Sequence, residues 1–431
     1  MKERCVGLGS RGVVEILSFL DPSGNPRVPK EAQALAEVGF EVAVATSCLP
    51  GSNRIPMTPS AAFQTRKLNQ RSPWWGRWRH RLMQKTAPFW PCSMRAQVAA
   101  YGSLFVDLVR YLQASRGPSV RIAHLEPAFL AAFHVGGFES ACCDFEDWYS
   151  EDLLPGSRSA ALTATLKGAE KSALSKSLGC WCTSQAMASA LAAEYGAEEP
   201  VVVRNVFPRR LREAIDGGWI DRPEMAKFVN QNNPSEPRPQ GAPVSFHWFS
   251  QTIGPGRGLE QVFQALEGVQ GEWELHLRGS LGGYASWLEE TCPRGVRSHL
   301  KIHALTGTDK LTSRIAEHDV GLACEARRPL SRDVTITNKF FQYLQAGLAV
   351  VASDTAGQRE AAGLAGGAVE LYGSGDADSL RATLQQLVLD REKLGSMRRS
   401  AWEAGARLVW ENEAPKLVEA VERVSGMRQK A

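Results

Sequence analysis

The segment from Thr335 to Glu360, TITNKFFQYLQAGLAVVASDTAGQRE, constrains the fold of this chain more than any other. Its first half has apolar residues at helical spacing, and Gly347 follows them, as glycine does where a helix ends with a positive φ. Leu348 to Ala352 is a continuous apolar run, the pattern of a parallel strand covered on both faces. Asp354 to Gly357 form a polar loop after that strand, at the edge where open α/β sheets bind ligands. The segment therefore predicts a doubly wound α/β domain.

Three polar residues of the same segment are candidates for ligand contact. Asn338 and Lys339 lie at the amino end of the predicted helix, and Gln342 lies on its polar side. A helix amino terminus beside a lysine suits a phosphate, because the first backbone N–H groups can donate and the helix dipole is positive there. Asparagine and glutamine side chains suit hydroxyl groups or a nucleobase.

This segment resembles the nucleotide-sugar-binding segment of GT-B glycosyltransferases, especially the large retaining group that includes family four. In that group a helix carrying a glutamate precedes a strand of the type A-x-G-x-P-V-V-A. The glutamate binds the ribose of the nucleotide, and another acid lies eight residues upstream. Here Gln342 and Val334 stand at these positions, so both carboxylates are absent. The resemblance implies an α/β GT-B fold, in which two Rossmann-like doubly wound domains face a cleft.

A glycine-rich loop opens the second predicted domain. The strand Val244 to Phe249 is followed by IGPGRG at 253–258 and a helix from Leu259 to Leu266. Glycines let backbone amides approach a phosphate, and an arginine adds a bidentate charge. The related enzymes grip the diphosphate with an arginine after the strand and a basic residue before the last glycine; Gln251 replaces the first here. The predicted donor contacts in this loop are Gly254, Gly256, Arg257 and Gly258.

The amino-terminal part reads as a strand, loop, helix and strand. Val13 to Leu20 and Glu41 to Thr46 are the strands, with a helix between them that ends near Gly39. The sequence NPRVPKEAQALAEVGFEVAVAT resembles the opening of the same transferases, where the first loop lies near the transferred sugar. The resemblance predicts that Gly24 and Arg27 contact the donor; the alternative is a surface turn with a solvated arginine.

Two further strand ends carry candidate catalytic residues. His124 ends the predicted strand Val120 to Leu125, and Glu146 and Asp147 follow the strand that starts near Ser140. The resemblance implies that His124 contacts the transferred sugar or the acceptor. A carboxylate at Glu146 or Asp147 can hold an acceptor hydroxyl or accept its proton. The alternatives are a structural histidine and an acidic cap on the next helix.

The region from Val42 to Val106 has no acidic residue. It contains nine Lys or Arg residues, and four tryptophans lie among them. Ser72 and Pro73 predict the start of a helix that ends near Thr86. Its Trp, Leu and Phe side chains fall within a sector of about 100°, flanked by basic residues. The segment 66–95 therefore predicts contact with an anionic membrane surface or a lipid-linked acceptor. Docking of the aromatic residues on the domain is the alternative, and no nucleic-acid-binding motif accompanies the segment.

Composition sets further limits. The chain has 431 residues, of which 43% are hydrophobic and 22% charged, as in ordinary globular proteins. It lacks an apolar run long enough to cross a bilayer and a recognisable signal peptide, so we expect a cytoplasmic protein, peripheral at the inner face of the membrane. Nine scattered cysteines without a C-x-x-C pair predict reduced thiols. We find no metal-binding motif and expect no cofactor apart from the donor co-substrate.

The sequence predicts four parts. Residues 1–207 form an amino-terminal acceptor domain, 208–243 a helical insert and linker, 244–409 a nucleotide-sugar domain, and 410–431 a helix that crosses back to the first domain. The linker prediction rests on NQNNPSEPRPQGAP at 230–243, which has no apolar period.

The predicted function is transfer of a sugar from a nucleotide diphosphate sugar to a glycan or lipid-linked acceptor, in cell-envelope polysaccharide or glycolipid synthesis. The resemblance implies retention at the anomeric carbon without a bound metal. Two other functions stay open: a GT-B binding or partner subunit without catalysis, and a sugar-nucleotide epimerase.

Overall fold

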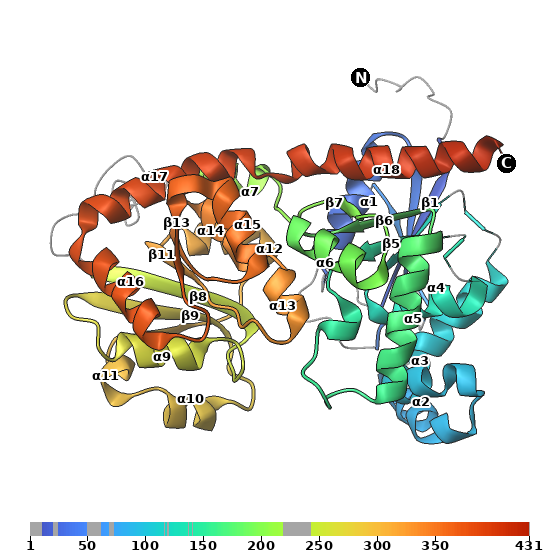
Figure 1. Cartoon of the computed structure of the whole chain (residues 1–431), viewed down its shortest axis with the longest axis horizontal. Helices are drawn as coiled ribbons and strands as arrows, with labels where there is room; N and C mark the ends of the chain where they lie inside the picture. Colours follow the sequence, from blue (N-terminus) through green and yellow to red (C-terminus); the bar gives the residue numbers. More distant parts are fainter. Residues whose placement is uncertain are drawn as a thin grey trace. The chain divides into compact units, whose positions relative to one another are not determined.

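A computed structural model describes residues 11–19, 25–49, 62–68, 73–115, 117–118, 120–136, 138–139, 141–218 and 243–430. The chain folds as two compact units, each built on a parallel sheet (Figure 1). The first unit contains Met1–Arg204 and Glu413–Ala431, and the second contains Asn205–Asn412. Gly24, Ser72 and most of the expected linker lie outside the described residues.

The first unit has a seven-stranded parallel sheet in the order β3-β2-β1-β4-β5-β6-β7. The chain order reverses between β1 and β4, which makes this pair the switch point of the sheet, where open α/β sheets bind ligands. The strands are β1 (Val13–Ser18), β2 (Glu41–Thr46), β3 (Gln64–Lys67), β4 (Val120–His124), β5 (Cys142–Phe145), β6 (Gly179–Cys182) and β7 (Val201–Val202).

Helices cover this sheet, and two of them begin at a serine that caps the helix. The hydroxyls of Ser159 and Ser184 accept from backbone N–H groups of α5 and α6, and Gly196 ends α6 with φ of 61°. The helices are α1 (Arg27–Glu37), α2 (Pro73–Thr86), α3 (Cys92–Ala114), α4 (Glu126–Gly136), α5 (Ala160–Lys176) and α6 (Gln185–Tyr195), with short 3-10 turns at Ala87–Phe89 and Tyr149–Glu151.

The second unit has a six-stranded parallel sheet in the order β10-β9-β8-β11-β12-β13, with its switch point between β8 and β11. Its strands are β8 (Val244–Thr252), β9 (Trp273–Ser280), β10 (Leu300–His303), β11 (Val320–Ala323), β12 (Ala349–Ser353) and β13 (Val369–Tyr372). Its helices are α7 (Arg210–Gly218), α9 (Leu259–Leu266), α10 (Ala285–Thr291), α11 (Arg294–Arg297), α12 (Thr308–Ile315), α13 (Leu330–Val334), α14 (Asn338–Ala346), α15 (Ala356–Ala365), α16 (Ala377–Leu389) and α17 (Arg391–Arg407). The terminal helix α18 spans Trp410–Lys430, and its residues from Glu413 onward belong to the first unit.

Two glycines let α14 pack closely within the second unit. A Cβ atom on Gly321 of β11 would overlap the ring of Tyr343, and one on Gly405 of α17 would overlap the backbone of Leu344. Every residue from Phe340 to Ala346 is buried as a result. This part of α14 is therefore enclosed by its neighbours, which differs from the expected amphipathic helix with Gln342 on an open polar face.

Both doubly wound sheets confirm the predicted fold class, and α2 confirms the predicted helix. Three details differ. The sequence analysis missed β3, since all four of its side chains are exposed and carry no apolar alternation. The strand expected to start near Ser140 is β5, which starts at Cys142 and includes Asp144, paired with Trp181 of β6. The expected loop to Gly357 is shorter, because α15 begins at Ala356. None of the helices in the described ranges combines the length and apolar composition needed to cross a bilayer.

Candidate functional site

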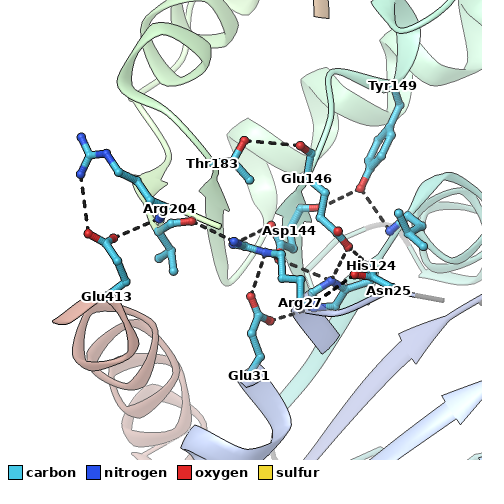
Figure 2. A network of polar contacts seen from close by, with 12 residues as sticks. Asn25, Arg27, Glu31, His124, Asp144, Glu146, Tyr149, Thr183, Arg204 and Glu413 are labelled. Carbon is cyan, nitrogen blue, oxygen red and sulfur yellow. Dashed lines mark hydrogen bonds and ion pairs between the residues drawn. The ribbon is translucent and has the colours of Figure 1, made fainter. Parts of the chain in front are cut away.

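A polar cluster lies at the carboxyl ends of β1, β4 and β5, at the switch point of the first sheet (Figure 2). We call it the Arg27 cluster. Its members come from the start of α1 and from the ends of β4 and β5. They are Asn25, Arg27, Glu31, His124, Asp144 and Glu146.

Arg27 lies at the centre of this cluster with its side chain fully buried. Its Nε and Nη2 donate to the two carboxylate oxygens of Asp144 at 2.5 and 3.2 Å. Nε also lies 3.0 Å from Glu31 Oε1, and Nη1 donates to the carbonyl oxygen of Val203 at 2.9 Å. The Arg27 guanidinium thus compensates two buried carboxylates.

His124 connects the interior of the cluster to its outer edge. Its Nε2 lies 2.9 Å from Glu31 Oε2, and its Nδ1 lies 2.9 Å from Glu146 Oε1. Asn25 Nδ2 donates to the same Glu146 oxygen at 2.7 Å. Since ionised carboxylates only accept, both ring nitrogens of His124 are placed to donate, which is the hydrogen-bonding pattern of an imidazolium.

Burial and neighbouring charges set the ionisation of the cluster. Burial alone lowers the pKa of His124, but the charges of Glu31 and Asp144 outweigh it and raise that pKa well above its ordinary value. Burial opposes ionisation of Asp144 too, yet Arg27 and His124 hold its pKa below the usual range. Burial, followed by the charge of Asp144, raises the pKa of Glu31. Burial and the neighbouring Arg27 charge lower the pKa of Lys30 to about 7.

The turn after His124 is fixed by a tyrosine. Leu125 has φ of 65°, the left-handed conformation that non-glycine residues rarely adopt. Its N–H donates to the Tyr149 hydroxyl at 3.1 Å, and that hydroxyl donates to the backbone oxygen of Asp144 at 2.7 Å. Such strained turns are concentrated at functional sites, where the surrounding structure holds them in place.

The terminal helix contacts the same region. Glu413 of α18 accepts from the backbone N–H of Arg204 at 3.0 Å, and the preceding residue, Val203, accepts from Arg27. Figure 2 shows this connection from α18 through the chain at 203–204 to the Arg27 cluster.

The structure brings some of the expected first-unit residues together and separates others. His124 and Glu146 are in contact, whereas Asp147 points to solvent. Arg27 is 0% exposed, so the alternative of a solvated surface arginine is wrong, and its contact with the donor stays a prediction. The Glu146 side chain is 11% exposed while the other five members of the cluster are buried. Glu146 is therefore the least buried member of the cluster.

In the second unit, the glycine loop follows β8 as expected. A Cβ atom on Gly254 would lie 2.8 Å from the Tyr284 ring, and one on Gly258 would lie 2.8 Å from Cys324. Gly258 has φ of 80° and directly precedes α9. Glycine is required at 258 because the loop must pass against the end of β11 in a left-handed conformation.

Several cationic side chains lie along this edge of the second sheet. Arg257 is exposed and donates to Ser250 Oγ at 3.1 Å, while Arg332 donates to the carbonyl oxygen of Gly256 at 2.9 Å. Lys339 Nζ lies 3.4 Å from Glu325 Oε1 and 5.6 Å from the centre of the Trp248 ring. Asn338 is exposed at the start of α14, where no side chain caps the helix.

Two residues of this edge were missed by the sequence analysis. Glu325 lies two residues after the end of the buried strand β11, and Arg332 lies in α13, which has only five residues. The position of Glu325 after a buried strand could have marked it as a candidate site residue. Arg332 had none, since its contact with the glycine loop joins residues far apart in sequence. Gln342, expected at the site, is 5% exposed and lies within the helix packing.

No protein-family model matches the sequence, and no curated protein matches it. Solved structures match along nearly the whole chain. Sucrose-phosphate synthase from Thermosynechococcus elongatus is 14% identical, with a TM-score of 0.67 over 94% of this chain and 97% of that one. Trehalose 6-phosphate synthase from Burkholderia multivorans is 13% identical, with a TM-score of 0.65 over 97% and 100%. The Anabaena protein HepE in complex with UDP-glucose is 14% identical, with a TM-score of 0.61 over 95% and 98%.

These similarities show that the chain has the GT-B fold of glycosyltransferases. At such low identities they establish the fold, and the chemistry has to be argued from the side chains.

Proposed function

We propose that this protein is a GT-B glycosyltransferase that uses a nucleotide diphosphate sugar as donor. One observation carries the proposal: the glycine loop, Arg257, Arg332 and Lys339 all lie at the carboxyl edge of the second sheet. Backbone N–H groups at a glycine loop and at a helix start, together with two guanidinium groups, suit the negative charge of a diphosphate. The complex of HepE with UDP-glucose supports the same ligand class.

In this proposal Arg257 and Arg332 stabilise the charge that develops on the leaving diphosphate. Arg332 supplies the second guanidinium, which the related enzymes take from the position of Gln251 here. Preorganised cations of this kind stabilise a transition state by roughly several kcal/mol. Glu325 lies 3.4 Å from Lys339 Nζ and would accept from the ribose hydroxyls in place of the two missing acids.

On the acceptor side, Glu146 would hold the acceptor hydroxyl, because it is the exposed member of the Arg27 cluster. His124 acts as a positioning residue, since it donates to Glu146 from inside the domain. We propose that transfer proceeds with retention and without a bound metal at the donor site, as the family resemblance implies. The acceptor is a glycan or a lipid-linked glycan of the cell envelope, and the protein works in the cytoplasm at the inner face of the membrane.

A thermal-shift panel tests the donor proposal. We expect one of UDP, GDP, ADP, TDP and CMP, with or without its sugar, to raise the melting temperature of the full chain. A ligand at 100 times its Kd adds about 2.7 kcal/mol of stability. A matched sample with Arg257→Ala should lose this shift. If a well-folded sample responds to none of these nucleotides, the second candidate is favoured, a partner subunit with a GT-B fold and no turnover.

The second candidate has one specific observation in its favour. Val334 and Gln342 stand where the related enzymes carry two acids, and Gln342 is buried in the packing of α14. Loss of both acids removes the usual ribose contact. A partner subunit would keep the fold and its binding surfaces without this contact.

We also propose that α2 contacts an anionic membrane surface. Trp74, Trp75 and Trp78 are 61%, 52% and 48% exposed, and their rings contact one another edge to face. Leu82 and Phe89 extend this exposed strip. The exposure favours the membrane alternative over docking of the aromatic residues on the domain, because large apolar side chains gathered on one face indicate an interaction surface.

The other face of α2 packs on α3, and the two helices lie side by side in Figure 1. Gly102 of α3 permits this approach, since a Cβ atom there would lie 2.7 Å from the backbone oxygen of His80. Arg79 points the same way and forms a bidentate pair with Asp107 at 2.5 and 2.7 Å. The remaining basic residues of the helix are exposed beside the aromatic strip. They are Arg77, Arg81 and Lys85.

Vesicle co-sedimentation tests this surface. We expect the full chain to bind vesicles rich in phosphatidylglycerol and to bind pure phosphatidylcholine vesicles weakly. The triple variant R77Q/R81Q/K85Q should lose about 100-fold in affinity, since each basic residue near an anionic surface contributes about 1 kcal/mol. Leu389→Ser is the control, because Leu389 is an apolar residue of the second unit that is 70% exposed. Equal binding of the triple variant and the wild type would contradict the proposal.

A further inference from the structure

Four of the eight histidines of the chain gather on one face of the second sheet. We call this group the histidine cluster. Three members come from neighbouring strands and one from the segment before β11. They are His247 of β8, His276 of β9, His303 of β10 and His318.

Strand alternation and parallel register bring these residues together. His247 is paired directly with His276 across β8 and β9. His303 is paired with Arg278, two residues beyond His276 and therefore on the same face. The opposite face of these strands carries the apolar core, including Phe246, Trp248, Leu275 and Leu277. Along these strands, histidines on one face thus alternate with core side chains on the other, and His318 packs against the histidine face.

The rings lie close together. His276 and His303 are nearly coplanar, with an interplanar angle of 7° and 2.9 Å between Nδ1 of the first and Nε2 of the second. The His318 ring centre lies 4.4 Å from those of His247 and His276. One ring nitrogen from each of His276, His303 and His318 can be chosen so that all three lie within 4.8 Å of one another.

Two of these side chains are buried without hydrogen bonds. His247 is 0% exposed and His318 is 3% exposed, and neither ring nitrogen of either residue has a partner among the described residues. Buried polar atoms are nearly always paired, because an unpaired one loses its hydration without compensation. Burying four imidazole nitrogens without partners destabilises the fold. A bound ligand that contacts ring nitrogens of this group would offset the cost.

We infer that His276, His303 and His318 form a binding site for a divalent transition metal, with Zn²⁺ as the best fit. Zinc takes imidazole nitrogens at about 2.0–2.1 Å in tetrahedral geometry, which places the nitrogens about 3.3 Å apart. His276 Nδ1 and His303 Nε2 lie 2.9 Å apart, and one nitrogen from each of the three rings can be chosen within 4.8 Å, so the rings must shift slightly to reach this spacing. Mg²⁺ and Ca²⁺ prefer oxygen ligands and do not suit three imidazoles.

A carboxylate already orients one of the proposed ligands. Glu274 Oε2 lies 3.2 Å from His276 Nε2, so this nitrogen donates to Glu274 and Nδ1 faces His303. A carboxylate behind a ligating histidine fixes its tautomer and raises its basicity, as in zinc sites generally. Lys301 holds Glu274 in place at 2.9 Å.

The surroundings of the histidines disfavour a positive charge on the rings. Burial and the neighbouring His303 lower the pKa of His276 to about 4, and burial lowers the pKa of His318 and His303. Neutral imidazoles are the ligand form. Arg278 adds positive charge to this face, with its Nη1 donating to the oxygen of Ala304, and Glu274 supplies the opposite charge beside His276.

A second group of possible ligands does not fit a metal. Glu31, His124 and Asp144 also place ligand atoms within 4.8 Å of one another. The Arg27 guanidinium already lies among them, 2.5 Å from Asp144 and 3.0 Å from Glu31. A metal ion there would meet a fixed positive charge, whereas Arg278 beside the histidine cluster donates to the carbonyl oxygen of Ala304.

The site would join β9, β10 and the segment before β11. These three pieces are separated in sequence, so a bound metal would link the edge strand β10 to the segment before the central strand β11. This role is structural and independent of the proposed transferase reaction.

The test is metal titration of the full chain after treatment with a chelator. We expect one equivalent of Zn²⁺ by calorimetry and the visible bands of tetrahedral Co²⁺ when cobalt is used. His276→Gln and His303→Gln should each abolish the tetrahedral Co²⁺ spectrum, and Glu274→Gln should weaken binding by about 10- to 100-fold. His299→Gln is the control: His299 stacks on Trp273 in the same unit, outside the cluster.

Binding that is unchanged in both histidine variants, or no binding by the wild type, would overturn the inference. His303 is only half-buried, so His303→Gln is expected to fold even if His276→Gln does not. Circular dichroism of each variant confirms folding before titration. In the folded variant, loss of the Co²⁺ spectrum supports the site and its retention refutes it.

Discussion

Arg27→Met is expected to destabilise the first unit by about 3–5 kcal/mol, the largest stability effect of any single change proposed here. The substitution keeps an apolar stem of similar length and removes the guanidinium. Asp144 and Glu31 would then lie fully buried with the His124 imidazolium as their remaining cation, one positive charge for two carboxylates. Removing one partner of a buried ion pair leaves a charge that is incompletely compensated, and this cost dominates.

Denaturant unfolding of the full chain measures this effect. For a unit of this size the predicted loss corresponds to a fall in melting temperature of roughly 6–20 °C. The matched control is Arg79→Met, which removes another bidentate arginine–aspartate pair from the same unit. That pair is partly exposed, so its loss should cost about 1 kcal/mol. If both variants lose similar amounts of unfolding free energy, the burial of Arg27 does not increase the cost of removing the guanidinium.

Arg257→Ala is expected to lower kcat/KM for sugar transfer by about 100- to 1,000-fold, the size seen when one preorganised donor to a developing charge is removed. Stability should be nearly unchanged, because Arg257 is exposed and makes a single hydrogen bond, to Ser250. Activity and melting temperature together separate a chemical effect from unfolding. Arg294→Ala is the control, an exposed arginine of the same unit away from the glycine loop.

The same variant distinguishes the two candidate functions. In a transferase, Arg257→Ala loses turnover while the fold persists. In a partner subunit, the wild type has no turnover to lose, and binding to its partner survives the substitution. Full activity in Arg257→Ala would remove the glycine loop from the proposed donor site.

The sequence was sufficient for the fold and for the location of the glycine loop. Continuous apolar runs such as Leu348 to Ala352 are typical of strands covered on both faces, and their alternation with helices predicts doubly wound sheets. The glycine loop was placed correctly because strand, loop and helix are consecutive in the chain. The strand β3 was missed since its pairing with β2 uses the backbone alone and leaves no pattern in its side chains.

The sequence by itself determined the class of the fold, the helix α2 with its aromatic strip, and the edge of the second sheet that carries the glycine loop. The tertiary structure decided which way individual polar side chains point. Arg27 turns inward because Asp144, 117 residues away, lies buried on a strand beside it. The histidines from 247 to 318 meet because parallel register aligns three separate strands. Periodicity is a local property, whereas the partner of a buried charge or imidazole is set by which distant strands become neighbours.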